Sequence, residues 1–144
     1  MKNEKFFWLV VVVFSLISCN STSNVTKTLT PLSQNDWQLF SLNTQQVSIV
    51  QGGKIPQLSF DTQNMRVSGN GGCNSLSGSF KLGKENLSFG PLATTRMACP
   101  GDNIETNFLS ALSKTEKFSM YNGKLVLNDS SGKQLMVFDP VKKE

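Results

Sequence analysis

The sequence contains no histidine among its 144 residues, and this absence excludes several kinds of site. A Ser-His-Asp or Cys-His nucleophile, a histidine general base and a histidine-bearing zinc or copper site all require an imidazole. The ten Asp and Glu side chains stand as scattered singles, with no spacing that predicts two facing carboxylates. We therefore expect a protein that is not an enzyme and that carries no cofactor and no metal.

Dense charge and long apolar runs are missing as well. The formal net charge is +4, and Lys142 and Lys143 form the only adjacent basic pair in the sequence. A cluster of basic residues interleaved with aromatic ones, as nucleic-acid-binding domains carry, is absent. No apolar run reaches the roughly 20 residues that a membrane-spanning helix needs. Nucleic acid is therefore not an expected partner, and we expect no spanning helix.

The amino terminus resembles the export signal of a bacterial lipoprotein. Two lysines precede the apolar block Phe6–Ile17, and the small Ser18 stands directly before Cys19. We predict that residues 1–18 are a signal peptide and that Cys19 becomes acylated, because two or more acyl chains hold a protein firmly to a bilayer. In the alternative interpretation an ordinary secretory signal is cleaved and Cys19 is incidental. The mature protein would then be free in the periplasm or the medium.

The remainder of the chain divides into a tether and one domain. Residues 19–30 hold the lipidated cysteine and a stretch of Ser, Thr and Asn without apolar periodicity, which is typical of a flexible spacer. Residues 31–144 are enough for one domain with its own core. Asn20 is not the aspartate that often signals inner-membrane retention in enteric bacteria. We therefore expect a lipid-anchored protein of the bacterial cell envelope, at the outer membrane and facing the periplasm.

Cys73 and Cys99 are the two cysteines that lipidation leaves free. Disulfides persist in the compartment that the signal predicts, so a disulfide between them is the expected state. The two residues are too far apart in the sequence for a Cys-x-x-Cys redox pair, and two cysteines without histidine make a poor metal site. A pair of buried free thiols is the alternative, because an unpaired cysteine also packs as a small apolar side chain.

Period-two alternation of apolar residues predicts a series of short strands joined by tight turns. The predicted strands span residues 37–42, 45–50, 58–60, 65–67, 79–82, 87–89, 118–121, 124–127 and 134–138. The pair Asn122-Gly123 is typical of a type I′ hairpin turn. Connections this short predict an antiparallel sheet. Residues 69–74 are too rich in glycine for a strand and are expected to form a turn.

One helix is predicted after residue 101. Asp102 can cap its amino end, and Glu105 would complete a capping box at the third position. The apolar residues that share one side at helical spacing are Ile104, Phe108, Leu109 and Leu112. We expect this side to cover a face of the sheet.

Two cysteine-containing blocks resemble the META domain family, the group typified by the heat-shock protein HslJ. They are Gly69-Asn70-Gly71-Gly72-Cys73-Asn74 with Gly78-x-Phe80, and Leu87-x-Phe89-Gly90-Pro91-Leu92-Ala93-x-Thr95-x-Met97-Ala98-Cys99, with Trp37-x-Leu39 upstream. The similarity spans residues 36–140. It implies a single small α+β domain in which one helix packs across a curled antiparallel sheet. Members are typically envelope or secreted proteins linked to stress tolerance, drug resistance or virulence, and no catalytic residues can be carried over from them.

Arg96 is the one charged candidate for a binding role. In an exposed bend beside the disulfide it could present a cation to an acidic ligand, with backbone amides of the glycine loop nearby. The favoured alternative is a solvated charge in a turn that positions Cys99.

Three classes of function stay open from the sequence. The first is a stress-related accessory that binds an apolar or amphipathic ligand between the sheet and its helix; the second is a pilot-like module that holds an envelope protein; the third is a structural lipoprotein. A cavity lined by Phe60, Phe80, Phe89, Phe108 and Phe138 would indicate the first. A solid core with an apolar surface patch would indicate the second, and a filled core under a uniformly polar surface the third. We expect a non-enzymatic binding module tethered to the membrane.

Overall fold

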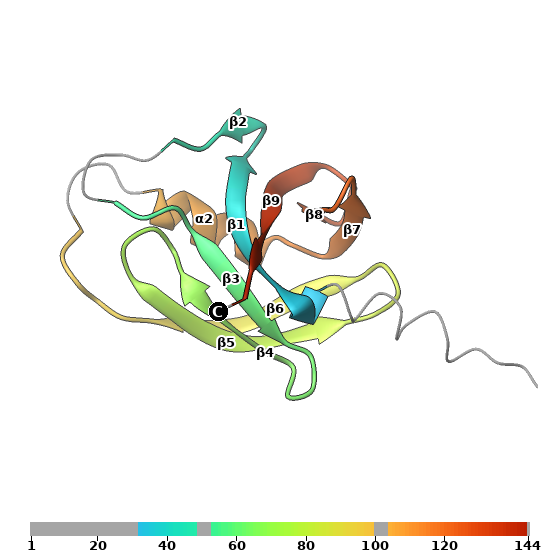
Figure 1. Cartoon of the computed structure of the whole chain (residues 1–144), viewed down its shortest axis with the longest axis horizontal. Helices are drawn as coiled ribbons and strands as arrows, with labels where there is room; N and C mark the ends of the chain where they lie inside the picture. The colour runs from blue at the N-terminus through green and yellow to red at the C-terminus, as the bar shows by residue number, and fades with distance from the viewer. Residues whose placement is uncertain (1–31, 49–52, 100–103, 144) are drawn as a thin grey trace, which may run out of the picture.

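The computed structural model of the chain describes residues 32–48, 53–99 and 104–143. Its main element is a nine-stranded antiparallel sheet in the order β6-β5-β4-β3-β1-β9-β8-β7, with β2 paired to β1 beside this path (Figure 1). The strands are β1 (Asn35–Leu42), β2 (Gln45–Gln46), β3 (Gln57–Asp61), β4 (Arg66–Asn70), β5 (Ser75–Leu82), β6 (Leu87–Thr94), β7 (Lys117–Tyr121), β8 (Lys124–Asn128) and β9 (Gln134–Lys142). The helix α2 spans Glu105–Ser113, and residues 32–34 are also helical.

The sheet curls until its two outermost strands meet at one end. Asn86 forms an antiparallel bridge with Lys117, next to the start of β6. The backbone N–H of Leu87 donates to the carbonyl of Glu116 over 3.1 Å, and the N–H of Phe118 donates to the carbonyl of Glu85 over 3.0 Å. The right-handed twist that accumulates along an antiparallel sheet brings such distant strands together. The result is a half-barrel.

Side chains on the inner face of the half-barrel form one core. Alternate residues of β5 point inward, so Leu76 and Phe80 are buried while the intervening Ser77 and Ser79 are exposed. The largest fully buried side chains are Trp37, Phe60, Phe108, Phe138, Leu32, Leu58, Leu87, Leu112, Leu125, Leu127, Met136 and Val67. The Phe60 ring meets the Phe80 ring edge-on, with centroids 5.2 Å apart. The phenylalanines therefore fill the interior.

The helix α2 packs its apolar side on this core. Phe108, Ala111 and Leu112 are buried, and the Phe108 ring lies 6.2 Å from the Phe138 ring of β9, centroid to centroid. The helix ends at Ser113, and the hydroxyl of Thr115 then donates to the carbonyl of Ala111 over 3.0 Å. The prediction that the apolar side of this helix covers the sheet is confirmed.

The predicted hairpins are confirmed, and several boundaries move. The turn Asn122-Gly123 has positive φ at both residues, 49° and 78°, as a type I′ turn requires. Within residues 45–48 only Gln45–Gln46 is a strand. Gly69 and Asn70 belong to β4, so the prediction of a turn over residues 69–74 is wrong for its first two positions.

The curled antiparallel sheet and the single small domain are as predicted, but strands dominate the molecule. The α+β class therefore describes it only loosely, and the expectation of a single helix is wrong. The helical residues 32–34 precede β1, where Trp37 Nε1 donates a 3.0 Å hydrogen bond to the carbonyl of Leu32. That bond satisfies the buried indole N–H and fixes the entry into the sheet.

The predicted signal peptide, residues 1–18, and the whole predicted tether with Cys19, residues 19–30, lie outside the described residues. Across the described ranges, the structure contains no helix that is both long enough and apolar enough to span a bilayer.

Candidate functional site

A groove runs between β6 and α2, and we call it the β6–α2 groove. Its lining residues are Phe89, Gly90, Pro91, Leu92 and Thr94 of β6 with Leu109 and Ser113 of α2, and its volume is about 420 Å³. Phe89, Leu92 and Leu109 are half-buried and pack on the core beneath. The Thr94 and Ser113 hydroxyls are the polar side-chain groups of this lining. The groove is therefore mainly apolar, with hydrogen-bonding groups added to it.

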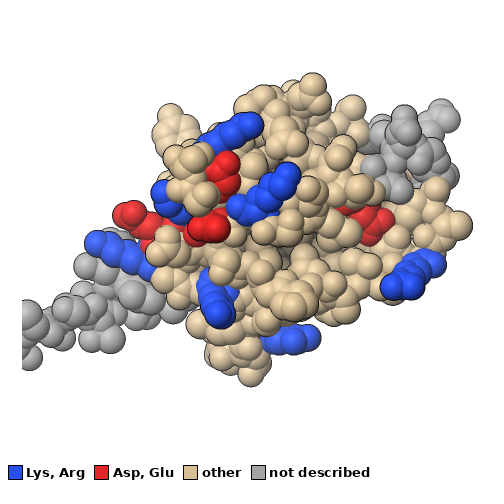
Figure 2. Space-filling model, turned by 180° about the vertical axis from the view of Figure 1, so that it is seen from behind, with Lys and Arg blue, Asp and Glu red and all other residues tan. Residues whose placement is uncertain are grey.

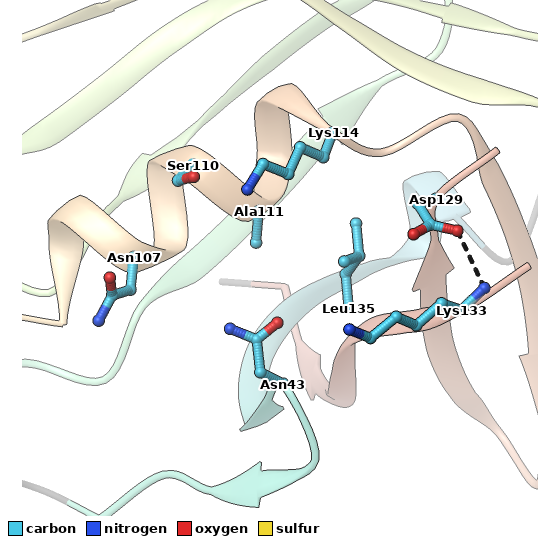
Figure 3. A pocket seen from close by; sticks show the side chains of 8 residues that line it. All are labelled: Asn43, Asn107, Ser110, Ala111, Lys114, Asp129, Lys133 and Leu135. Carbon is cyan, nitrogen blue, oxygen red and sulfur yellow. Dashed lines mark hydrogen bonds between the residues drawn. The ribbon is translucent and has the colours of Figure 1, made fainter. Parts of the chain in front are cut away.

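A second hollow, which we call the lysine hollow, lies on the other side of α2 (Figure 3). It measures about 410 Å³ and is lined by Asn43, Asn107, Ser110, Ala111, Lys114, Asp129, Lys133 and Leu135. Lys114 comes from the helix and Lys133 from the opposite wall; Asn107 lies nearer the other end of the helix, and Asn43 lies below the helix (Figure 3). This hollow is polar and carries two ammonium groups.

Helical spacing explains why α2 separates two unlike hollows. Leu109 and Ser113 are four positions apart and so lie on one side of the helix. Asn107, Ser110 and Lys114 follow at intervals of three and four, and so lie on another side. Because each side has its own composition, one helix presents an apolar wall to β6 and a polar wall to the β8–β9 connection.

Asp129 lines the lysine hollow but serves mainly to hold a turn. Its Oδ1 accepts hydrogen bonds from the Ser131 hydroxyl and N–H, at 2.6 and 2.9 Å, and from the backbone N–H of Lys133 at 3.0 Å. The Ser131 hydroxyl, with the backbone donors of the turn, lowers the pKa of Asp129 below its usual value of 3.8. Its Oδ1 is thus already occupied by donors of the turn.

The surface opposite to that of Figure 1 mixes charges of both signs. Figure 2 shows basic and acidic side chains interspersed on it, with uncharged surface between them. Among the described residues visible there, basic side chains do not join into one continuous patch.

A partly buried group of side chains, which we call the disulfide cluster, surrounds the disulfide. The structure joins Cys73 to Cys99, with 5.9 Å between their Cα atoms, and so the alternative of two free thiols is wrong. Both cysteines are half-buried. Cys99 Sγ lies 3.6 Å from Glu105 Oε2, which is a contact and not a hydrogen bond because a disulfide sulfur carries no proton. The disulfide therefore sits against the first residue of α2.

Asn74 is the centre of this cluster. Its Oδ1 accepts the backbone N–H of Met97 at 2.7 Å and the Thr95 hydroxyl at 2.9 Å. Its Nδ2 donates to Glu105 Oε2 at 2.9 Å and to Cys99 Sγ at 3.3 Å. These partners fix the orientation of the amide, because only the oxygen can accept from Met97. One side chain thus ties the glycine-rich loop to the 95–99 segment and to the helix.

Glu105 is buried, with 6% of its surface exposed, although it is a carboxylic acid. Its Oε2 is bonded to Asn74, whereas its Oε1 is buried without a hydrogen-bond partner in the described part of the chain. Gly71 leaves room for it, because a Cβ at that position would lie 2.8 Å from Glu105 Cγ. As the first helical residue, Glu105 also lies where the helix dipole favours a negative charge.

The capping role predicted for Glu105 is wrong. The residue before the helix is Ile104, the helix begins at Glu105, and no side chain of the described residues caps its amino end. The carboxylate of Glu105 points to Asn74 instead, and Asp102 lies outside the described residues. Neither Asn74 nor the inward role of Glu105 was predicted. Helical spacing could have indicated that Glu105 points inward, because Glu105 lies on the same side of the helix as Phe108 and Leu112.

The phenylalanine-lined cavity is replaced by packed rings. Phe60, Phe80, Phe108 and Phe138 are buried in the core, and Phe89 alone of the five lines the β6–α2 groove. A hollow does lie between the sheet and its helix, as the first class of function requires. Its walls come from residues 89–94 of β6 and from α2, and not from the four buried phenylalanines.

Arg96 is exposed, and within the described chain its guanidinium has no protein partner. The backbone N–H groups of the glycine-rich loop, which an anion beside Arg96 would need, already donate hydrogen bonds within the protein. The N–H of Gly71 donates to the carbonyl of Asn74 at 2.9 Å, and the N–H of Gly72 donates to Asn70 Oδ1 at 3.0 Å. The geometry therefore favours a solvated Arg96.

Comparison with known proteins settles the family. The sequence pattern that defines the META domain matches residues 30–142. The chain belongs to the META domain family. The resemblance of the two cysteine blocks is thereby confirmed, and the match extends over the whole described META domain.

Solved structures of similar fold carry titles that state no activity. One NMR structure, titled only as that of a protein, is 28% identical to this META domain protein; it matches 75% of this chain and 90% of its own, with a TM-score of 0.59. A second, from Burkholderia xenovorans, is also 28% identical, matches 81% of this chain and 88% of its own, and has a TM-score of 0.61.

A duf4847 family protein from Bacteroides vulgatus, solved by crystallography, shares the fold at 12% identity, over 78% of this chain and 96% of its own, with a TM-score of 0.54. No curated protein matches the chain.

Proposed function

We propose that this META domain protein is a non-enzymatic binding module of the bacterial cell envelope, tethered through an acylated Cys19, and that it holds an amphipathic molecule in the β6–α2 groove. The observation that carries the proposal is the composition of the groove. Phe89, Pro91, Leu92 and Leu109 supply apolar surface, and the Thr94 hydroxyl adds a hydrogen-bonding group. The Ser113 hydroxyl donates to the Ser110 carbonyl over 2.8 Å and can still accept a hydrogen bond. A ligand with an apolar body and a polar end satisfies both.

The size of the groove supports a small molecule. Its volume of about 420 Å³ lies within the range of roughly 300–1,000 Å³ that is typical of ligand sites. Its walls come from a strand and a helix that pack on the same core, so the site is preformed. A preformed apolar site binds without the cost of ordering its own walls.

The proposed tether gives this site access to its ligand. Acyl chains on Cys19 would keep the domain beside a bilayer, where amphipathic molecules concentrate. In this role the protein is a stress-related accessory that sequesters or carries such molecules in a damaged envelope.

Native mass spectrometry of the full chain, extracted from membranes in lipid-preserving polymer particles, tests the proposal. Two tryptophan substitutions form a matched pair on the helix. Ser113→Trp fills the β6–α2 groove, and Ser110→Trp places the same side chain in the lysine hollow; both serines are exposed. We expect a non-covalent amphipathic ligand on the wild type and on Ser110→Trp, and its loss from Ser113→Trp.

The opposite results contradict the proposal. A wild-type protein that carries no non-covalent mass leaves a structural lipoprotein as its function. A ligand that persists unchanged on Ser113→Trp does not occupy the groove.

A pilot-like protein-interaction module is the second candidate, and the place of β6 favours it. This strand is the outermost one on its side, and its described backbone bonds to the β7 side are confined to its start near Leu87. An extended polypeptide can add to such a strand while its apolar side chains enter the neighbouring groove. The same mass spectra would then show a bound polypeptide that Ser113→Trp displaces.

A further inference from the structure

The disulfide cluster holds three side chains with the composition of a metal site. One ligand atom each from Cys73, Cys99 and Glu105 lies within 4.8 Å of the others. While the two sulfurs are bonded to each other, neither is a thiolate, and thiolates are the sulfur ligands of zinc. We propose that reduction of the Cys73–Cys99 disulfide turns this cluster into a zinc-binding site made of two thiolates and the Glu105 carboxylate.

The chemistry of the switch is balanced as follows. A dithiol reductant gives two electrons and two protons to the Cys73–Cys99 bond, so that the bond breaks into two thiols and the reductant becomes a disulfide. The zinc ion then displaces one proton from each thiol and coordinates both sulfurs. Both cysteines are half-buried, and this partial exposure gives a reductant access to the bond.

The existing spacing of the cluster fits a tetrahedral ion. A thiolate sulfur and a carboxylate oxygen on one tetrahedral zinc lie about 3.6 Å apart, given bond lengths of about 2.3 and 2.1 Å. Cys99 Sγ and Glu105 Oε2 already lie 3.6 Å apart. The two thiolates would stand about 3.8 Å apart on the ion. Side-chain rotation after the sulfur–sulfur bond breaks can supply that separation.

The unpartnered oxygen of Glu105 is an independent sign of a missing ligand. Glu105 is 6% exposed, and its buried Oε1 accepts no hydrogen bond from the described residues. A buried carboxylate oxygen left without a donor is costly, and native structures rarely leave one without a functional reason. A cation that binds both oxygens of this carboxylate would satisfy Oε1 as well as Oε2.

Asn74 would act as the positioning residue of the site. Metal-binding carboxylates are usually held by a hydrogen bond from a neighbouring group. Asn74 Nδ2 already donates to Glu105 Oε2, and its Oδ1 is fixed by Met97 and Thr95. The carboxylate would therefore keep its place when the disulfide opens.

The test uses cadmium, whose bonds to thiolates give a charge-transfer band in the ultraviolet. The full chain carries a Cys19→Ser substitution, so that Cys73 and Cys99 are its only thiols, and is measured oxidised and after reduction with a phosphine. We expect one equivalent of Cd²⁺ to bind the reduced protein with the band, and none to bind the oxidised protein. Zinc should displace the cadmium and abolish the band.

Matched variants separate a built site from adventitious binding. Glu105→Gln keeps the shape of the side chain and should weaken Cd²⁺ binding by about tenfold or more while the thiolate band persists. Glu116→Gln alters an exposed carboxylate outside the cluster and should change nothing. Circular dichroism records whether the reduced protein stays folded.

Several results would overturn the proposal. They are a reduced protein without the band, a reduced protein that is unfolded with or without Cd²⁺, and an affinity that is the same in Glu105→Gln as in the parent chain. Equal binding by the oxidised protein would also overturn it, because the disulfide leaves no thiolate.

Discussion

The amide of Asn74 and the carboxylate of Glu105 meet over 2.9 Å across 31 positions of sequence. Both residues are polar and buried, and their bond joins the glycine-rich loop to the first turn of α2. The same amide holds the backbone of Met97. The end of the sheet, the disulfide and the helix therefore depend on one polar side chain.

Asn74→Ala should destabilise the protein by about 2–6 kcal/mol, because it leaves Glu105 Oε2 and the Met97 N–H without partners and each loss costs about 1–3 kcal/mol. Urea unfolding measures the difference. Asn107→Ala is the matched control on an exposed helix position, where the change should stay within about 0.5 kcal/mol. Equal effects of the two substitutions would contradict the central role of Asn74.

Gly69→Ala should destabilise the protein far more than Gly132→Ala. A Cβ at Gly69 would lie 1.9 Å from the carbonyl oxygen of Gln57, so β3 and β4 would have to move apart. Gly132 has a φ of +90° and open space around it, and its substitution should cost only the conformational strain of about 1–2 kcal/mol. Thermal unfolding compares them. Similar unfolding midpoints of the two variants would show that β4 can move away from β3 without loss of stability.

Acid should weaken the turn at Asp129. Its pKa is lowered by the Ser131 hydroxyl and by backbone donors, so the folded state favours the ionised carboxylate. This contribution to stability is complete above the usual pKa of 3.8 and is lost as the pH falls through the lower folded value. Ser131→Ala should raise the pKa of Asp129 toward 3.8, as measured by NMR titration of the carboxyl carbon.

Asp61 is the internal control for that titration. Its pKa is lowered chiefly by the Asn64 side chain, and Ser131→Ala should leave it unchanged. A common shift of both aspartates would indicate a general change in charge and not the loss of one hydrogen bond.

Cys19→Ala should release the protein from membranes or leave it unprocessed. Acylation at Cys19 supplies the proposed anchor, and alanine has no sulfur to accept an acyl chain. Fractionation of cells followed by mass spectrometry of the mature amino terminus measures both effects. An unmodified Cys19 in the wild-type membrane fraction would contradict the anchor.

The sequence predicts the hairpins well because each depends on neighbouring residues. The Asn122-Gly123 pair and the apolar alternation around it determine the β7–β8 hairpin locally. The alternation of apolar and polar residues predicts burial wrongly where the backbone departs from regular strand pairing. Between Leu39 and Ser41 the register of β1 against β9 shifts, so Phe40 is 36% exposed while Ser41 is buried. Only the pairing of β1 with β9 reveals that bulge.

The candidate site likewise combines features that local sequence predicts with features that depend on distant residues. The Cys73–Cys99 pairing follows from the expected compartment and from the number of cysteines, whereas the partner of Glu105 does not. A Glu three residues after an Asp fits a capping box, and this local interpretation competes with a long-range bond to Asn74. The flexibility of Gly69 likewise predicts a turn, although the structure uses its small size for the close approach of β3. Distant neighbours decide both cases.

The meeting of β6 and β7 also closes one end of the half-barrel to strand pairing with other copies of the chain. Free strand edges template the association of identical chains into fibrils. The bridge between Asn86 and Lys117 occupies both terminal strands there with each other. At that end, copies of this protein have no open ladder to extend, even when they are packed closely together.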